Sequence, residues 1–368
     1  MPAGNKDMGE ILMQGIVKEI AAKVFEGKRI SFEEGLELWE KADTLLLGYL
    51  ADTVRRRLHP DGVVTFVVDR NINYTNICTC GCHFCAFFRP PGHPEGYVLT
   101  REEIFRKIEE TLEAGGTQIL MQGGLHPDLG LSFFEELFRE IKARYPITLH
   151  SLSPVEVDFL ARKEGLAVEE VLRRLKESGL DSLPGGGAEI LVDEVRQRIS
   201  PRKTPVSRWL EVMRAAHRLG MKSTATMMFG SVETLEDRLK HLEELRRLQD
   251  ETGGFTAFIP WSYQPGNTAL GGKPATAEDY LRTLAISRIY LDNIPNIQVS
   301  WVTQGAKTAQ IALSFGANDF GSTMLEENVV RAAGAVFRCS KEDIIRVIKD
   351  AGFRPAQRDN LYNVLRYF

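Results

Sequence analysis

TREEIFRKIEETLEAGGTQILMQGG, residues 100–124, contains a predicted helix followed directly by a predicted strand. Thr100 and Glu103 form a predicted capping box, and the glycine pair 115–116 predicts the end of the helix. Within the helix, apolar residues recur on one face at Ile104, Ile108 and Leu112. The apolar run 117–122 follows at once and predicts a buried strand. A helix joined so closely to a strand is typical of a parallel βαβ unit.

The same alternation continues on both sides of this unit. Eight short apolar runs occur in order: VVTFVVD (63–69), TQILMQ (117–122), ITLHSL (147–152), GLDSLP (179–184), MKSTATMMFG (221–230), FTAFIP (255–260), NIQVSW (296–301) and GANDFG (316–321). Each except the last is followed by a plausible helix. Strands that alternate with helices predict parallel pairing with right-handed crossovers. Eight of them predict an α/β protein with a (β/α)8 TIM-type barrel; an open doubly wound sheet is the alternative.

Both ends of the chain carry additions to this barrel. Apolar residues keep helical spacing through residues 8–57, and His-Pro-Asp-Gly at 59–62 is a clear turn. We therefore expect an N-terminal helical extension at 1–60, the barrel at 61–322, and a C-terminal helical region at 323–368 packed on the barrel.

The overall composition indicates a soluble globular protein. Of 368 residues, 43% are hydrophobic and 26% charged, and the net charge of −4 gives no general attraction to nucleic acid or anionic membrane. No apolar run reaches the roughly 18 residues of a membrane span, and the first residues lack the pattern of a signal peptide. We expect a cytoplasmic protein, where thiols stay reduced and clustered cysteines indicate metal or redox chemistry rather than disulfides.

Four of the five cysteines lie in NICTCGCHFCAFF, residues 76–88, directly after the first predicted strand. A structural zinc site usually needs four ligands in two separated pairs, and the fifth cysteine, Cys339, stands alone. A [4Fe–4S] cluster is large enough for three thiolates from one loop, and its fourth iron then stays open. Cys78, Cys82 and Cys85 form the spacing C-x3-C-x2-C, but spacing alone does not settle the ligand set. C-x-C-x2-C, through Cys80, is also readable, and a non-catalytic iron–sulfur or zinc protein remains the alternative class.

This spacing, with Phe84 just before the last cysteine, resembles that of radical S-adenosylmethionine (SAM) enzymes. The stretches LMQGGLHP, PGGGAEIL, IPWSYQPGNTAL and GANDFGSTMLEENVV are similar to those of the branch with menaquinone futalosine-pathway and deazaflavin enzymes. The resemblance covers residue 30 to the end. It implies a [4Fe–4S] cluster ligated by Cys78, Cys82 and Cys85, SAM bound at the fourth iron, and Cys80 as a bystander.

The resemblance also implies which residues contact SAM. The turn after the second strand corresponds to the one that binds the methionyl amine, so Gly123 and Gly124 receive that role. The remaining SAM-contact assignments are Phe84, Gln122, Glu189 and Arg202. Glu189 follows a glycine-rich stretch after strand four, where SAM needs an acceptor for its ribose or amine, and Arg202 could meet a carboxylate.

Two reactions of this branch compete. One converts dehypoxanthine futalosine to its cyclic form by hydrogen abstraction and ring closure; the tail and the 259–270 stretch favour it. The other, aminofutalosine synthesis, adds the adenosyl radical to a chorismate-derived enol ether. Cyclisation requires a base near the ring, a cation or amide for the benzoate carboxylate, and a dry pocket.

Position at strand ends provides the candidates for substrate chemistry. These are His150, Trp261, Gln304 and Asp319. His150 or Asp319 could be the base, and Trp261 could stack on the substrate. The implied partners are a small-molecule substrate and an electron donor such as flavodoxin or ferredoxin, with no nucleic acid and no membrane.

Overall fold

The computed structural model describes residues 15–368, so residues 8–14 of the first predicted helix lie outside the described part. The helices are α2 (Ile16–Phe25), α3 (Phe32–Lys41), α4 (Thr44–Leu58), α5 (Arg101–Glu113), α6 (Leu131–Arg144), α7 (Pro154–Glu164), α8 (Val168–Glu177), α9 (Asp193–Ile199), α10 (Val206–Arg218), α11 (Leu235–Thr252), α12 (Ala277–Tyr290), α13 (Trp301–Ala312), η1 (Leu313–Phe315), α14 (Val329–Ala332) and α15 (Lys341–Asp350). The strands are β1 (Val63–Val67), β2 (Asp69–Ile72), β3 (Gln118–Met121), β4 (Thr148–Ser151), β5 (Ser182–Leu183), β6 (Lys222–Phe229), β7 (Phe255–Ser262), β8 (Asn296–Ile297), β9 (Asp319–Ser322), β10 (Arg354–Arg358) and β11 (Val364–Tyr367).

Local sequence explains why several helices begin where they do. The predicted capping box at Thr100 is present: its hydroxyl accepts from Glu103 N–H, and the Glu103 carboxylate accepts from Thr100 N–H. The same reciprocal pair opens α3 at Ser31 and Glu34. These contacts satisfy backbone donors that the first turn of a helix leaves free.

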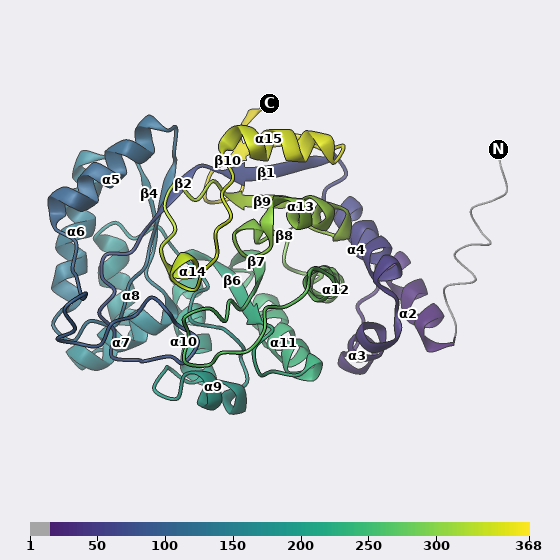
Figure 1. Cartoon of the computed structure of the whole chain (residues 1–368), viewed down its shortest axis with the longest axis horizontal. Helices are drawn as coiled ribbons and strands as arrows, with labels where there is room; N and C mark the ends of the chain where they lie inside the picture. The colour runs from purple at the N-terminus through teal and green to yellow at the C-terminus, as the bar shows by residue number, and fades with distance from the viewer. Residues whose placement is uncertain (1–14) are drawn as a thin grey trace.

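All eight predicted apolar runs form strands, and the (β/α)8 architecture is confirmed. Strands β2 to β8 pair in chain order, all parallel. Strand β1 covers most of the first run, β2 follows it after Val68 and extends beyond the run, and β9 pairs with β1. A parallel bridge between Gln298 and Asp319 links the end of β8 to β9. The seven-stranded parallel sheet and its continuation through β9 and β1 thus form a TIM-type core, with helices outside it (Figure 1).

The C-terminal region differs from the expectation of a purely helical segment. Helices α14 and α15 are present, but β10 pairs in parallel with β1, on the side opposite β9, and β11 pairs antiparallel with β10. β10 forms its backbone hydrogen bonds with a strand about 290 positions away in the chain. No local sequence pattern predicts this pairing. Figure 1 shows this hairpin and α15 beside β1.

The N-terminal helices cover one end of the molecule, opposite α5, α6 and α8 (Figure 1). Helix α4 packs against α12. Arg282 of α12 donates to the Ala42 carbonyl at 2.9 Å and also to the Trp39 carbonyl. Leu38, Trp39 and Leu47 are fully or almost fully buried there. The extension is thus part of the core.

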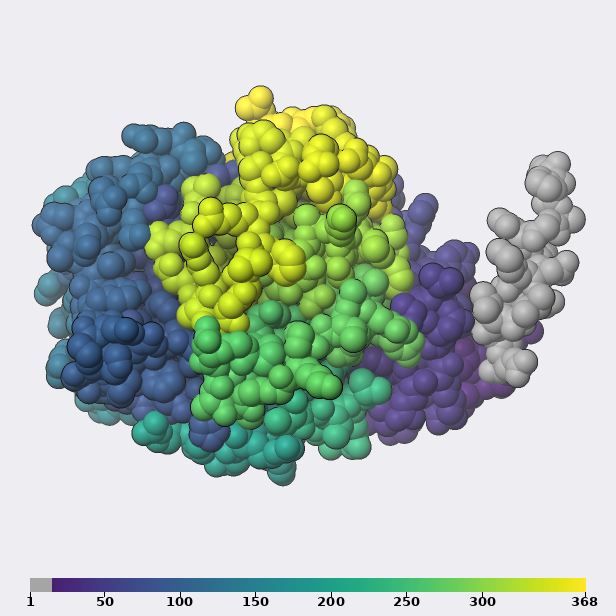
Figure 2. Space-filling model, in the orientation of Figure 1, coloured from purple at the N-terminus to yellow at the C-terminus, as the bar shows by residue number. Residues whose placement is uncertain are grey.

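Two long loops cross the middle of the face seen in Figure 2, where the segment after β9, in yellow, meets the green loop after β7. Asn267 of the β7 loop donates to the Ala332 carbonyl at 2.9 Å. A Cβ on Gly266 would lie 2.3 Å from the Ala333 carbonyl oxygen, so only glycine allows this approach.

Candidate active site

The loop after β2 presents the cysteines, and three different regions hold it. Cys78 N–H donates to the Arg89 carbonyl at 2.9 Å, Thr79 N–H to the Leu125 carbonyl at 3.1 Å, and His83 N–H to the Ile199 carbonyl at 2.9 Å. The loop is therefore fixed between its own return, the end of β3 and the end of α9. This loop lies at the carboxyl ends of the strands, as the sequence predicts.

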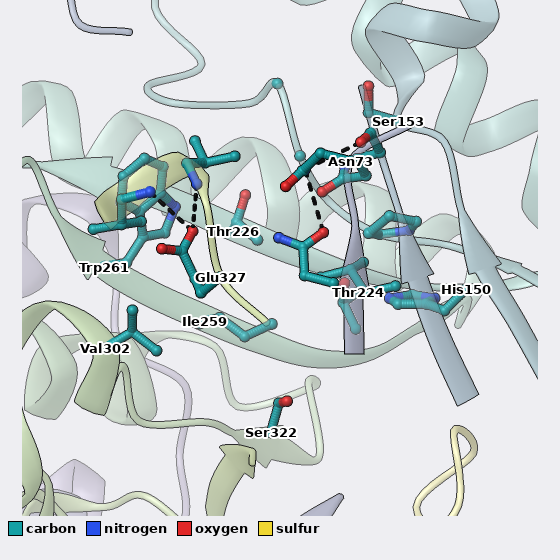
Figure 3. Close-up of a pocket in the computed structure, with 18 of the residues that line it drawn as sticks. Asn73, His150, Ser153, Thr224, Thr226, Ile259, Trp261, Val302, Ser322 and Glu327 are labelled. Carbon is teal, nitrogen blue, oxygen red and sulfur yellow. Dashed lines mark hydrogen bonds between the residues drawn. The ribbon is translucent and has the colours of Figure 1, made fainter. Parts of the chain in front are cut away.

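Cys78, Cys80, Cys82 and Cys85 all line one cavity of about 410 Å³. Alternate residues of the strands point into it: Asp69 and Asn71 of β2, Gln118 and Leu120 of β3, Thr224 and Thr226 of β6, and Ile259 and Trp261 of β7. Figure 3 shows Trp261 and Glu327 at one side of the cavity and His150 with Thr224 at the other. TIM-barrel interiors are usually filled by side chains, so an open interior indicates a ligand site.

The cysteines suit a cluster better than a single ion. Within residues 15–368, no three Cys, His, Asp or Glu side chains converge closely enough to hold one metal ion. A [4Fe–4S] cluster needs one thiolate per iron, not convergence on one point. The Cys80 thiol donates to Cys78 and Cys82, and this lowers the pKa of Cys78 to about 6 and also lowers the pKa of Cys82. Burial raises the pKa of Cys85.

The turn that follows β3 packs directly on the cysteine loop. A Cβ on Gly124 would lie 2.2 Å from the Ile77 carbonyl oxygen, and one on Gly123 would lie 2.6 Å from the Tyr74 ring. Gln122, Gly123 and Gly124 all line the cavity, as expected for SAM contacts. Their glycines allow close approach of protein to protein as well as of protein to ligand.

Glu156, which the sequence analysis missed, holds this turn. Its carboxylate accepts from Gly123 N–H at 3.1 Å, from the Tyr74 hydroxyl at 2.7 Å and from the Ser153 hydroxyl at 2.6 Å. Burial raises the pKa of Glu156 to about 7 despite these three donors.

Glu189 lies in the cavity wall with one oxygen free. Its Oε1 pairs with Lys203 Nζ at 2.8 Å, and its Oε2 is buried without a hydrogen-bond partner; Arg196 is 3.7 Å from it. Lys203 also lies over the Phe84 ring, 5.2 Å from its centroid. Burial lowers the pKa of Lys203, because it disfavours the charged ammonium. The negative charges of Glu189 and the nearby thiolates outweigh this effect, so the pKa of Lys203 is raised overall. An orphaned acceptor beside the cysteines suits the ribose hydroxyls or the amine of SAM.

Arg202 occupies a different place from the one expected. It is exposed, does not line the cavity, and donates through Nε to the Cys80 carbonyl at 3.0 Å. Its neighbour Lys203 lines the cavity instead. Arg202 therefore supports the cysteine loop from outside.

Of the four candidates for substrate chemistry, two line the cavity and two do not. His150 and Trp261 line the cavity. His150 Nδ1 lies 2.7 Å from the Ser182 hydroxyl, and burial, aided by Arg358, lowers its pKa to about 3. Gln304 does not line the cavity; its amide donates to the Ser262 hydroxyl at 2.6 Å and supports the end of β7.

The expectation that Asp319 faces the active site is not met. It is the first residue of β9, not a residue beyond the strand, and it does not line the cavity. Its carboxylate is fully buried and accepts from Thr65 Oγ1 and Arg358 Nε, both at 2.5 Å, from Arg358 Nη2 at 3.0 Å and from Gly321 N–H at 2.9 Å. These bonds leave no free oxygen to act as a base.

The end of β10 and the turn after it supply further lining residues that the sequence analysis missed. Arg358, Asn360 and Tyr362 line the cavity from the end opposite the cysteines. No pattern in the sequence could have placed them there, because they reach the barrel only through the pairing of β10 with β1.

Comparison with known proteins identifies the family. The radical SAM superfamily profile matches residues 72–245, and the CofH/MqnC C-terminal region profile matches residues 252–367. A "Cyclic dehypoxanthine futalosine synthase" of Halalkalibacterium halodurans is 49% identical over 351 residues, 95% of each chain. The chain belongs to the radical SAM superfamily. It is an enzyme that uses a [4Fe–4S] cluster and SAM for radical chemistry.

Two further relatives of this radical SAM enzyme have names that also refer to futalosines. The "Cyclic dehypoxanthine futalosine synthase" of Streptomyces coelicolor is 46% identical, over 96% of this chain and 89% of that one. The "Aminodeoxyfutalosine synthase" of Thermus thermophilus is 41% identical, over 94% of this chain and 95% of that one.

Solved structures support the fold. The FeFe-hydrogenase maturase HydG from Carboxydothermus hydrogenoformans superposes with a TM-score of 0.75 at 19% identity, covering 97% of this chain and 82% of that chain. Methylornithine synthase (PylB) gives 0.72 at 18% identity, with 92% and 97% covered. Among the described helices, none is long and apolar enough to cross a membrane.

Proposed function

We propose that this enzyme converts dehypoxanthine futalosine to cyclic dehypoxanthine futalosine, a step of menaquinone biosynthesis. The observation that carries the proposal is the 49% identity, over 95% of both chains, to a relative named for that product. The relative named as an aminodeoxyfutalosine synthase is 41% identical. The site agrees with the proposal, because its cysteines line a cavity of about 410 Å³.

Cys78, Cys82 and Cys85 would hold the cluster, and Cys80 would donate to two of the bound sulfurs without being a ligand. Gln122, Gly123, Gly124, Phe84 and Glu189 would contact SAM, with Lys203 in place of Arg202. When bound, the reduced cluster and SAM supply a 5′-deoxyadenosyl radical that removes a hydrogen atom from the substrate. The protein positions the reactants and excludes water.

Different residues that line the cavity have different proposed roles. Trp261 and Ile259 give an apolar wall beside the substrate, which keeps water from the carbon radical. His150 stays neutral at physiological pH because its pKa is about 3, so it serves as a hydrogen-bond partner and not as the proton acceptor. An electron donor such as flavodoxin or ferredoxin in the cytoplasm would reduce the cluster.

The test is anaerobic turnover. The protein is reconstituted with iron and sulfide and mixed with SAM, dithionite and dehypoxanthine futalosine, and products are followed by mass spectrometry. The expected result is substrate-dependent 5′-deoxyadenosine and a product lighter than the substrate by two hydrogens. A fully loaded cluster that gives neither product contradicts the proposal.

The second candidate is aminodeoxyfutalosine synthesis, which the 41% identical relative favours. The two reactions differ in the fate of SAM. Synthesis places the adenosyl group in the product, whereas cyclisation releases 5′-deoxyadenosine. SAM labelled in its adenine ring distinguishes them, because the label leaves with 5′-deoxyadenosine only in the cyclase.

A further inference from the structure

The turn between β10 and β11, residues 359–363, closes the cavity at the end away from the cysteines. Asn360 and Tyr362 of this turn line the cavity. Asn360 Nδ2 donates at 2.9 Å to the hydroxyl of Ser182, the first residue of β5. That hydroxyl also bonds to His150. The turn is thus joined to the amino ends of the barrel strands, opposite the cysteine loop.

Hydrogen bonds to Asp359 link the residues of the turn, and Tyr362 has an unfavourable backbone conformation. The Asp359 carboxylate accepts from Leu361 N–H at 2.8 Å and from Asn363 N–H at 2.9 Å. Tyr362 has φ of 68°, a left-handed value that costs free energy for any residue with a Cβ. Such strain persists where the surroundings over-determine it, and it is common at ligand sites.

The Tyr362 side chain packs against Arg358, and the described part of the chain gives no acceptor for its hydroxyl proton. The Arg358 guanidinium lies over the ring, 3.8 Å from its centroid. The Tyr362 hydroxyl and Gln118 Oε1 are both buried, and neither has a partner among the described residues. Both residues line the cavity. Buried polar groups are rarely left unpaired, so two at one end of a cavity indicate a polar ligand group there.

At this end the charge of Arg358 is paired with that of Asp319, so a ligand group is recognised through hydrogen-bond donors. Among the described residues that line the cavity, the Lys and Arg side chains are Lys203, beside the cysteines, and Arg358, at the turn. Arg358 donates once through Nε, once through Nη1 and twice through Nη2, so one of its five N–H groups stays free. His150 is neutral, and burial raises the pKa of Asp69, which weakens the competing negative charge.

We propose that this turn binds the carboxylate at the aromatic end of the substrate, through the Tyr362 hydroxyl and the free N–H of Arg358. The inference rests on the proposed function, because the benzoate belongs to that substrate. It orients the molecule with its aromatic acid at the turn and its sugar toward the cysteines. Hydrogen abstraction then occurs at the sugar, beside SAM.

Binding of a fragment tests this without turnover. Equilibrium dialysis measures the affinity of the reconstituted, SAM-loaded protein for 3-acetylbenzoate and for its uncharged analogue 3-acetylbenzamide. The variant is Tyr362→Phe, which keeps the ring and removes only the hydroxyl. Its control is Tyr367→Phe, on the same hairpin but outside the cavity and 46% exposed. Thermal melts check that both variants are folded.

We expect the wild type to bind the benzoate at least about 10-fold more tightly than the benzamide, since hydrogen bonds to a charged group are the stronger. Tyr362→Phe should remove about 10-fold of the benzoate affinity and little of the benzamide affinity, whereas Tyr367→Phe should change neither. The inference is overturned if the wild type does not bind the benzoate. It is also overturned if Tyr362→Phe leaves the benzoate affinity unchanged, or if it lowers the affinities for benzoate and benzamide equally.

The same experiment separates the two proposals. If the fragment behaves as expected but dehypoxanthine futalosine is not cyclised, the proposed function fails and the carboxylate site stands. If cyclisation proceeds while Tyr362→Phe binds the benzoate like the wild type, the carboxylate site fails alone.

Discussion

At the carboxyl ends of the strands, four cysteines come from eight consecutive residues, and their loop is anchored mainly by backbone hydrogen bonds. At the amino ends, the polar groups come from β2, β3, β4 and β9 and from a turn near residue 360. There the contacts are between side chains, such as Arg358 with Asp319 and Asn360 with Ser182. A local sequence motif forms the cysteine end of the cavity, whereas packing between residues far apart in the chain forms the end at the turn.

The difference shows in what each end can tolerate. The cysteine end depends on the chemistry of a few side chains that a cofactor uses. The turn end depends on a buried ion pair whose partners are 39 positions apart, so a change there affects folding before it affects chemistry. Four experiments test this contrast.

The largest effect is expected at the cysteines. Cys82→Ser should lose the cluster, because the remaining thiolates leave a second iron without a protein ligand. Iron content should fall from about four per chain to near zero, and product formation should fall more than about 100-fold. Cys80→Ser is the control and should keep both the iron content and product formation of the wild type, as measured by iron analysis and turnover. Loss of iron in Cys80→Ser would instead support the C-x-C-x2-C ligand set.

At the other end, Asp319→Asn should lower the free energy of unfolding by about 3–5 kcal/mol, because it leaves the buried Arg358 without its counter-charge. Urea unfolding measures this. Asp250→Asn, which breaks a largely exposed pair with Arg29, should cost no more than about 1 kcal/mol. Lost turnover with unchanged stability would return Asp319 to the role of catalytic base.

A smaller effect is expected for SAM. Glu189→Gln should raise the KM for SAM about 10-fold, because the free acceptor Oε2 and the partner charge of Lys203 are both altered. Glu194→Gln, on an exposed position of α9, is the matched control and should leave KM unchanged. An unaltered KM in Glu189→Gln would remove this residue from the SAM site.

The smallest effect concerns pH. The folded protein lowers the pKa of His150 from 6.5 to about 3, so the unfolded chain binds a proton first as pH falls below 6.5. The stabilisation by the neutral imidazole is thus complete above pH 6.5 and is lost progressively toward pH 3. Between pH 7.5 and 5.5, the wild type should lose about 1.4 kcal/mol more than His150→Asn. Equal urea midpoint shifts would show that His150 is not buried as described.

Much of the fold could be predicted from single runs of residues. Each of the eight apolar runs became a strand because its apolar side chains are buried between the helices and the barrel axis. The position of β10 could not be predicted, since RPAQR has no strong pattern and forms a strand only against β1. The same reason explains the wrong expectation of a wholly helical C-terminal region.

The candidate site divides in the same way. Phe84, Gln122, Gly123, Gly124 and Glu189 follow strand ends, and all line the cavity. Their positions in the chain predict that Arg202 and Asp319 also face the cavity. The directions of their side chains place both outside it. Arg202 turns outward to Cys80, and Asp319 begins its strand and pairs with Arg358.

The alternation of strands and helices, the cysteine spacing and the cofactor that this spacing serves could all be read from the amino-acid sequence. These features depend on neighbours within a few residues, which are close in space because they are close along the chain. Folding was needed to bring Lys203 to Glu189, Glu156 to the glycine turn, and Tyr362 and Arg358 to the end of the cavity. Those contacts join residues tens to hundreds of positions apart, and their geometry exists only after the barrel has closed.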